Sequence, residues 1–203
     1  MVTLNGNVLC AIDVETTGTV AGYHELTQVC FLPLDDDLNP RKDVVPFDLL
    51  IKIEREERID WDALRITKTN FMKHQQTAID QYTAADLFDS WVEKLNLPLN
   101  KRISPLAHNW PFDRSFIMEW LQPTGFGNYI DGRYRDSMAT ANSINDTYDL
   151  LNEPIPFPKV NLAYLVSLLK LERHGAHTAL GDCMDTAQVY RKLITKGYLD
   201  GTN

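Results

Sequence analysis

Residues Val8 to Glu15 read V-L-C-A-I-D-V-E, an apolar, β-rich run that turns polar at its end. This pattern is typical of a buried central strand whose last residues reach the edge of a sheet. The run T-T-G at positions 16–18 then ends the strand. Because side chains alternate along a strand, Asp13 and Glu15 are expected on the same face of the sheet.

After this first strand, the sequence predicts two more strands and then a mixture of strands and helices. Leu26–Leu34 and Phe47–Ile53 are predicted as two further strands, which suggests that the first three strands form a meander. A brief strand is predicted at Ile103–Ala107. Apolar spacing and capping residues predict helices over Thr83–Leu95, after a cap at Asn109, and over Asp136–Leu151, Leu162–Lys170 and Thr178–Ile194.

This order of elements predicts an α/β fold in which helices cover a sheet. The length of 203 residues fits a single domain over residues 1–203. No apolar run approaches the ~18 residues of a membrane span, and the start lacks a secretory signal, so a cytoplasmic location is expected.

The formal charge of −8 argues against a protein that coats long stretches of duplex, because such binding uses clustered Lys and Arg. It does not exclude nucleic acid. An enzyme that holds one strand end through metal ions needs few basic side chains, since the bound cations supply the positive charge.

The carboxylates of Asp13 and Glu15 would repel each other unless a cation neutralised them. Hard oxygen ligands of this kind suit Mg²⁺ or Mn²⁺, although an ordinary polar strand end has the same pattern. Asp113 follows a strand near the start of a helix, where it could be a ligand or a partner of the helix dipole. His177 stands five residues before Asp182, and this spacing could point both side chains toward one site.

Three segments together carry a family resemblance: A-I-D-V-E-T-T-G, then A-H-N-W-P-F-D-R-S-F-I, then A-H-T-A-L-G-D-C-M-D-T-A-Q-V-Y. In this order and spacing they resemble the three exonuclease motifs of the DEDDh family. That family includes proofreading subunits of bacterial replicative polymerases and oligoribonucleases. The resemblance implies a ribonuclease H-like fold with a mixed sheet of about five strands flanked by helices.

The resemblance also implies roles for individual residues. Two divalent cations, Mg²⁺ or Mn²⁺, would be bound by Asp13, Glu15, Asp113 and Asp182, with His177 as the general base. A sister subfamily has Tyr four residues before the last Asp, where this chain has Thr178, so the histidine version is indicated. Backbone groups of Thr16, Thr17 and Gly18 would hold the terminal 3′-hydroxyl, and Asn109 would help to shape the substrate site.

The implied activity is 3′→5′ hydrolysis of terminal phosphodiester bonds in single-stranded DNA or RNA, which releases nucleoside 5′-monophosphates. The alternative is a catalytically silent module of the same fold that binds nucleic acid or associates with a polymerase. The sequence does not identify a protein partner; a replication or repair polymerase is one candidate class. The two hypotheses differ in one observation, the metal-stimulated release of nucleotides.

Several residues keep alternative interpretations. His174 is a rival base, but its spacing to Asp182 favours a place on the loop surface. Many relatives carry a large apolar wedge just after T-T-G, where this chain has Thr19 and Val20. The two candidates for stacking on the terminal bases are therefore Trp110 and Phe112, although both aromatics fit the core equally well. Asp185 could support the metal site, although a solvated helix face is the favoured interpretation.

Overall fold

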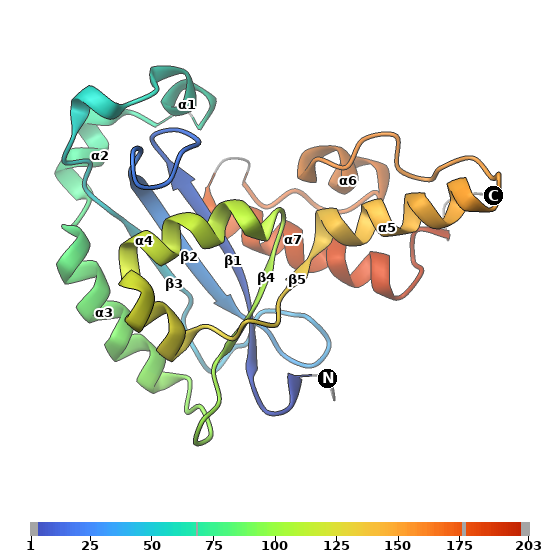
Figure 1. Ribbon diagram of the computed structural model, residues 1–203, viewed down its shortest axis with the longest axis horizontal. Helices are drawn as coiled ribbons and strands as arrows, with labels where there is room; N and C mark the ends of the chain where they lie inside the picture. The colour runs from blue at the N-terminus through green and yellow to red at the C-terminus, as the bar shows by residue number, and fades with distance from the viewer. Residues whose placement is uncertain (1–3, 68, 176–177, 200–203) are drawn as a thin grey trace.

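A mixed sheet of five strands runs through the centre of the protein, in the order β3-β2-β1-β4-β5. The computed structural model describes residues 4–67, 69–175 and 178–199. The strands are β1 (Val8–Thr16), β2 (Leu26–Pro33), β3 (Phe47–Leu50), β4 (Ile103–Ala107) and β5 (Arg135–Asp136). This arrangement confirms the predicted α/β class with a mixed sheet, seen at the centre of Figure 1.

The sheet has an antiparallel half and a parallel half. β1 pairs with β2, and β2 with β3, in antiparallel fashion, which confirms the predicted meander. On the other side, β1 pairs in parallel with β4, and β4 in parallel with β5. The carboxyl ends of β1, β4 and β5 therefore meet at one edge of the sheet, the place where α/β proteins commonly bind ligands. The two-residue strand β5 was not predicted, because so short a segment has no readable periodicity.

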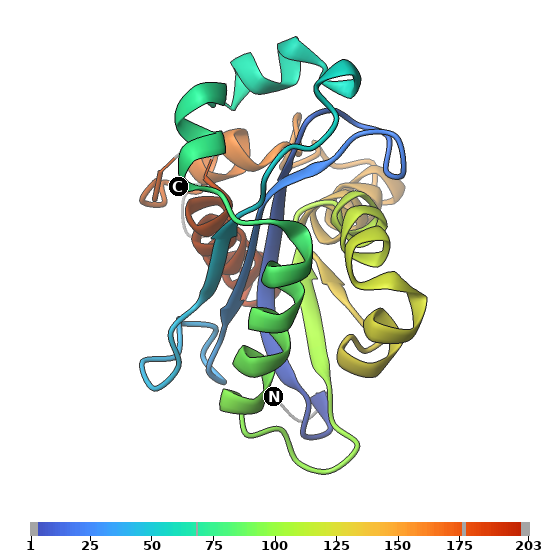
Figure 2. The same cartoon turned by 90° about the vertical axis from the view of Figure 1, so that its left-hand side faces the viewer.

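Alternation along β1 sends its side chains into two different cores. Cys10, Ile12 and Val14 belong to the core beneath α3 (Gln81–Lys94) and α4 (Trp110–Tyr129). Leu9 and Ala11 pack with α7 (Ala179–Ile194) on the opposite face. Figures 1 and 2 show the same two layers of helices with the sheet between them. Residues of β1 with odd numbers thus face α7.

The remaining helices extend these layers. A short turn η2 (Glu56–Arg58), α1 (Trp61–Ile66) and α2 (Phe71–Thr77) form an arm near the loop that joins β1 to β2. α5 (Ser137–Leu150) and α6 (Leu162–Leu168) pack against α7. Among the described residues, no helix combines the length and apolar character needed to cross a bilayer.

One predicted helix start is wrong, and one predicted capping residue makes no side-chain hydrogen bond to its helix. α3 begins at Gln81 rather than Thr83, because the Asp80 carboxylate accepts the N–H groups of Tyr82 (3.1 Å) and Thr83 (2.9 Å). The side chain of Asn109 does not cap α4.

Asp136 takes the place of Asn109 as the cap of α4. Its carboxylate, at the end of β5, accepts the N–H groups of Asn109 (3.3 Å) and Trp110 (2.7 Å). The backbone of Asn109 has a φ of 80°, in the left-handed region that Asn tolerates better than most residues. Asp136 also accepts the N–H of Ala139 in α5, so one carboxylate fixes the start of two helices.

Candidate active site

Three acidic side chains from two elements meet at the carboxyl end of β1. Asp13 and Glu15 lie on the β1 face that is covered by α7, and Asp182 lies in the first turn of α7. One carboxylate oxygen from each of these residues lies within 4.8 Å of the other two. The period of two in the strand and the position of the helix start together produce this cluster.

Asp113 approaches the same end of β1 from the opposite layer. Its Oδ1 accepts the backbone N–H of Val14 at 3.2 Å, beyond Ala11, the last β1 residue paired with β4. Asp113 is therefore held by the strand, and it is not one of the three residues whose oxygens converge. Its charge still reaches the cluster, because it raises the pKa of Asp13.

Burial and mutual repulsion raise the pKa values of Asp13, Glu15 and Asp113. Burial is the main cause that raises the pKa of Asp13, and the charges of Asp113, Glu15 and Asp182 add to it. The pKa of Glu15 rises to about 7, again through burial first and through Asp182 second. Burial likewise raises the pKa of Asp113, against the opposing hydrogen bond from Val14. A cation in the cluster would remove this repulsion.

The donor set fits a hard divalent ion. All three converging groups are carboxylates, the ligands that Mg²⁺ and Mn²⁺ prefer, and no Cys or His among the described residues is part of this group. The three cysteines of the chain are buried free thiols, and none of them is part of the cluster. The observed donors therefore agree with the expected cofactors.

The start of α7 is fixed by a close approach of the loop that precedes it. Thr178 caps the helix by accepting the N–H of Gly181 at 3.2 Å. A Cβ on Gly181 would overlap with the backbone oxygens of His174 and Gly175, so glycine is needed for the loop to pack here. His177, the predicted general base, lies outside the described residues.

A buried aspartate, Asp185, contacts the acidic cluster through Arg173. Asp185 is fully buried and binds the guanidinium of Arg173, whose second nitrogen lies 3.0 Å from Asp182 Oδ1. Asp185 also accepts the backbone N–H of His174 at 3.2 Å and lies 3.1 Å from its Nδ1. The favoured interpretation of Asp185 as a solvated position is therefore wrong, and so is that of His174 as plain loop surface. Arg173 was missed, because nothing in its local sequence marks it.

The loop at residues 16–18 is held firmly by its neighbours. The Thr17 N–H donates to the Glu25 carbonyl, and the Thr17 carbonyl accepts the N–H of Asp60, both at 2.8 Å. The hydroxyl of Thr16 donates to the Gly18 carbonyl at 2.6 Å. The three loop residues are buried, so the predicted substrate loop is a fixed part of the wall next to Glu15.

A comparison with protein families matches residues 10–190 to the model described as RNase T, exonuclease. This match covers most of the chain. The chain belongs to the RNase T exonuclease family. Membership confirms the resemblance to DEDDh exonucleases that the three motifs indicated. A search of curated protein sequences finds no match.

Solved structures of exonucleases share the fold. The zinc-bound form of E. coli exonuclease I with single-stranded DNA has a TM-score of 0.72 at 17% identity, over 96% of this chain and 42% of that one. Cell-death related nuclease 4 has a TM-score of 0.71 at 17% identity, over 94% of this chain and 64% of that one. Exonuclease I from Methylocaldum szegediense has a TM-score of 0.68 at 20% identity, over 94% of this chain and 40% of that one. This chain thus spans less than half the length of the exonuclease I structures.

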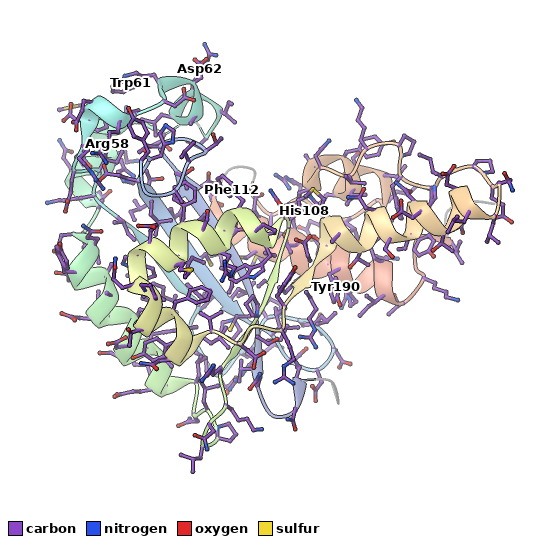
Figure 3. All side chains as sticks on the ribbon, viewed as in Figure 1. Arg58, Trp61, Asp62, His108, Phe112 and Tyr190 are labelled. Carbon is purple, nitrogen blue, oxygen red and sulfur yellow. The ribbon has the colours of Figure 1, made fainter. Side chains whose placement is uncertain are left out.

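The structure also has no large apolar side chain just after T-T-G that could act as a wedge between bases. Thr19 and Val20 are both exposed. Trp110 is only 2% exposed, so the possibility that it stacks on a base is wrong. Phe112 is half-buried against Phe116 and stays near the site, as its label in Figure 3 shows.

His108 has a structural role beside the site. Its Nδ1 lies 2.8 Å from the hydroxyl of Ser137 at the start of α5. Burial lowers its pKa, which keeps the ring neutral near pH 7. This contact holds the His108 ring against the start of α5.

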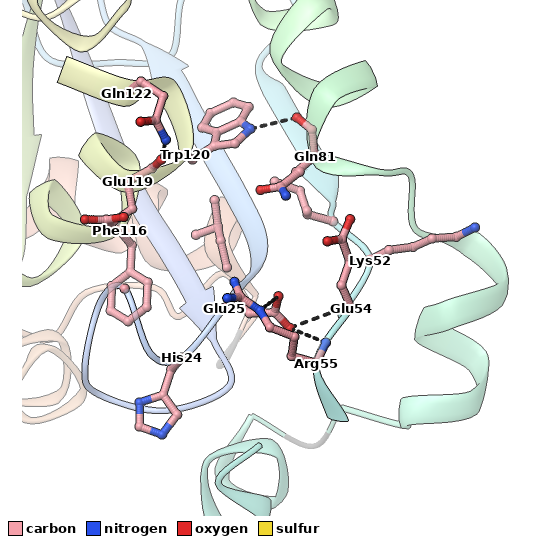
Figure 4. Close-up of a pocket in the computed structure, with 13 residues that line it drawn as sticks. His24, Glu25, Lys52, Glu54, Arg55, Gln81, Phe116, Glu119, Trp120 and Gln122 are labelled. Carbon is pink, nitrogen blue, oxygen red and sulfur yellow. Dashed lines mark hydrogen bonds and ion pairs between the residues drawn. The ribbon is translucent and has the colours of Figure 1, made fainter. Parts of the chain in front are cut away.

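A pocket of about 240 Å³ opens beside the loop after β1 and is drawn in Figure 4. The Glu25 carboxylate on its wall pairs with Arg55 at 3.0 Å and accepts the backbone N–H groups of residues 54 and 55. The indole N–H of Trp120 donates to the Gln81 carbonyl at 3.0 Å. These polar groups of the wall already have partners within the protein, and the pocket contains none of the converging acids.

Proposed function

We propose that this protein is a metal-dependent 3′→5′ exonuclease that removes nucleoside 5′-monophosphates from single-stranded ends. The observation that carries the proposal is the convergence of Asp13, Glu15 and Asp182 at the carboxyl edge of the sheet in a member of an exonuclease family. Residues 1–203 act in the proposal as one exonuclease domain.

Four carboxylates hold the ions in this proposal. Asp13, Glu15 and Asp182 contribute the converging oxygens, and Asp113 contributes the oxygen that does not accept the Val14 N–H. Two ions, Mg²⁺ or Mn²⁺, would when bound place positive charge on the scissile phosphate and lower the pKa of the attacking water. The protein supplies a buried, acidic setting in which charged groups act strongly on one another.

The remaining groups place the substrate and move the proton. His177, with an unperturbed pKa of ~6.5, accepts the proton of the attacking water near neutral pH. The rigid loop at 16–18 and Asn109 border the terminal nucleotide. Because the loop is already fixed by Glu25 and Asp60, little ordering is needed when the strand end binds.

Arg173 and Asp185 orient one of the acids. Asp185, which is fully buried, fixes Arg173, and Arg173 in turn holds Oδ1 of Asp182. Hydrogen bonds of this kind keep a ligating carboxylate in the geometry that the ion requires. In this account Arg173 and Asp185 are positioning residues.

Single strands suit the surface charge. A net charge of −8 leaves little basic surface to hold a second strand. The similar fold of E. coli exonuclease I has been solved with single-stranded DNA and zinc, which supports both the class of substrate and the need for a metal.

The test compares the same sequence as single-stranded DNA, single-stranded RNA and blunt duplex DNA, each with Mg²⁺ or Mn²⁺. Nucleoside 5′-monophosphates are expected from at least one single strand, faster than from the duplex. Faster release from the blunt duplex would contradict the substrate form. Absence of release from every substrate would favour the catalytically silent module instead.

A further inference from the structure

We propose that Trp61 is a stacking site for a nucleobase upstream of the strand end, which takes over the role of the missing wedge. This inference rests on the proposed exonuclease function and specifies how the substrate strand is held.

Trp61 differs from the other three tryptophans of the chain. Trp110 is buried, while the indole N–H groups of Trp91 and Trp120 donate to the carbonyls of Val45 (2.8 Å) and Gln81 (3.0 Å). Trp61 is 58% exposed. An exposed indole offers a flat aromatic face on which a nucleobase can stack.

The indole ring of Trp61 is exposed, but its position is fixed by its neighbours. Its ring makes an edge contact with Phe71, with centroids 5.9 Å apart and an interplanar angle of 70°. Trp61 is also the first residue of α1, directly after the capping residue Asp60, whose side chain accepts the N–H of Asp62 at 3.0 Å. The ring is therefore presented to solvent from a defined position, which lowers the entropy lost when a base stacks on it.

The position of Trp61 is tied to the active site through one hydrogen bond. The Asp60 N–H donates to the carbonyl of Thr17 at 2.8 Å. Thr17 belongs to the loop that follows the acidic residues of β1 and borders the terminal nucleotide in the proposal. Figure 3 shows Trp61 and Arg58 in the arm that lies beyond this loop, at the end of the sheet toward which β1 runs. A strand that leaves the site past this loop meets Trp61.

A second aromatic flanks the same loop. Tyr23 is 51% exposed, and its ring contacts His24, which itself packs on Gly18. The guanidinium of Arg58 lies 5.3 Å from the centre of the Tyr23 ring. An aromatic face and a cation at this point suit a base and a phosphate of the same strand.

The charge of this arm favours stacking over phosphate binding as the source of affinity. Arg58 lies 3.9 Å from Glu57, and Arg65 lies 3.1 Å from Asp62, so these cations are partly neutralised. Stacking is also tolerant of sequence, because every base has a π-face. Thr19 and Val20 offer no comparable aromatic surface, whereas the Trp61 indole is 58% exposed.

The experiment measures kcat/KM on single-stranded 8-mers that carry one abasic site at each of the positions 2 to 5 from the 3′ end. The variants are Trp61→Ala, Trp61→Phe and, as a matched control, Tyr82→Ala, an aromatic that is 73% exposed at the start of α3. Hydrolysis of the p-nitrophenyl ester of thymidine 5′-monophosphate is measured in parallel, because this substrate reports the metal site without an upstream base.

Trp61→Ala should lower kcat/KM on the intact strand by about 5- to 100-fold, the range for one lost base–aromatic contact. In the parent an abasic site at one position should cause a similar loss, and this loss should vanish in Trp61→Ala. Trp61→Phe should retain most of the parental value, Tyr82→Ala should match the parent, and ester hydrolysis should be unchanged in all three variants.

The inference is overturned if Trp61→Ala keeps the full abasic profile of the parent, or if ester hydrolysis falls as much as strand hydrolysis. Failure of the parent to hydrolyse both the ester and the strands would instead remove the proposed exonuclease function. The two failures are thus distinguishable.

Discussion

Arg173 lies 3.0 Å from Asp182, while the same guanidinium is held on its other side by the buried carboxylate of Asp185. These contacts connect Asp182, a proposed metal ligand, to the buried residue Asp185 of the same helix, α7. A carboxylate that is held in this way has fewer orientations to lose when an ion binds.

Asp185→Asn should therefore weaken the binding of Mn²⁺ by about 10- to 100-fold, the usual effect of losing such a support. The asparagine keeps the volume of the side chain but not the charge that fixes Arg173. Isothermal titration with Mn²⁺ measures the effect, and Asp146→Asn, at an exposed position of α5, is the control. Parental affinity in Asp185→Asn would show that Asp182 needs no such support.

The raised pKa of Glu15 predicts how stability depends on pH in chelator. The unfolded chain releases this proton near its ordinary pKa of 4.5, whereas the folded protein keeps it up to about 7. The contribution of Glu15 to stability is therefore fully present below 4.5, falls as the pH rises toward about 7 and then levels. Thermal unfolding of Glu15→Gln should show a shallower fall over this window than the parent.

The melting temperature in the presence of divalent ions provides a second test of the acidic cluster. At a pH above 7 the carboxylates repel one another, so Mg²⁺ or Mn²⁺ should raise the melting temperature of the parent more there than at pH 5. Equal stabilisation at both pH values, or identical slopes for Glu15→Gln and the parent, would contradict the acidic cluster as the ion site.

His177→Ala should separate chemistry from binding. We expect turnover to fall by ~10² to 10⁴, with the binding of Mn²⁺ and single strands close to parental, because a general base acts on the proton alone. The rise of log turnover with pH up to the apparent pKa should flatten in this variant. His174→Ala is the comparison: it disturbs Asp185 and should keep the pH dependence. A parental rate in His177→Ala would remove His177 from its role.

Gly18 and His24 form a testable pair. A Cβ at position 18 would overlap with the His24 ring, whose Nδ1 accepts the N–H of Val20 at 3.0 Å. Gly18→Ala should displace the loop and reduce kcat/KM, whereas adding His24→Ala should restore part of the loss by making room. If the double variant is as impaired as Gly18→Ala, the ring is not the obstacle.

The elements that the sequence predicted well depend on local periodicity. The alternation along β1 placed Asp13 and Glu15 on one face, and both residues do face α7. The start of α7 was predicted one residue early, at its cap Thr178, which put Asp182 in the first turn.

The features that the sequence could not show depend on contacts between distant residues. Asp136 caps α4 across 26 positions of the chain, so the local pattern pointed to Asn109 instead. The sequence offered Trp110 as a stacking residue, but Trp110 is buried against neighbours from other elements, whereas Trp61, which the sequence did not single out, is exposed. The burial of Asp185 likewise depends on Arg173 and His174 from the preceding loop.

The central claim is metal-dependent removal of nucleotides from the 3′ end, and digestion of a 5′-labelled single-stranded oligonucleotide tests it most directly. With Mg²⁺ or Mn²⁺ the parent should give a ladder of labelled strands that shorten one nucleotide at a time, while chelator should leave the strand intact. Asp13→Asn should give little or no ladder at low Mn²⁺ and recover partly at high Mn²⁺. A ladder that persists in chelator, or release of the 5′ label as a mononucleotide before any shorter strand forms, would contradict the account.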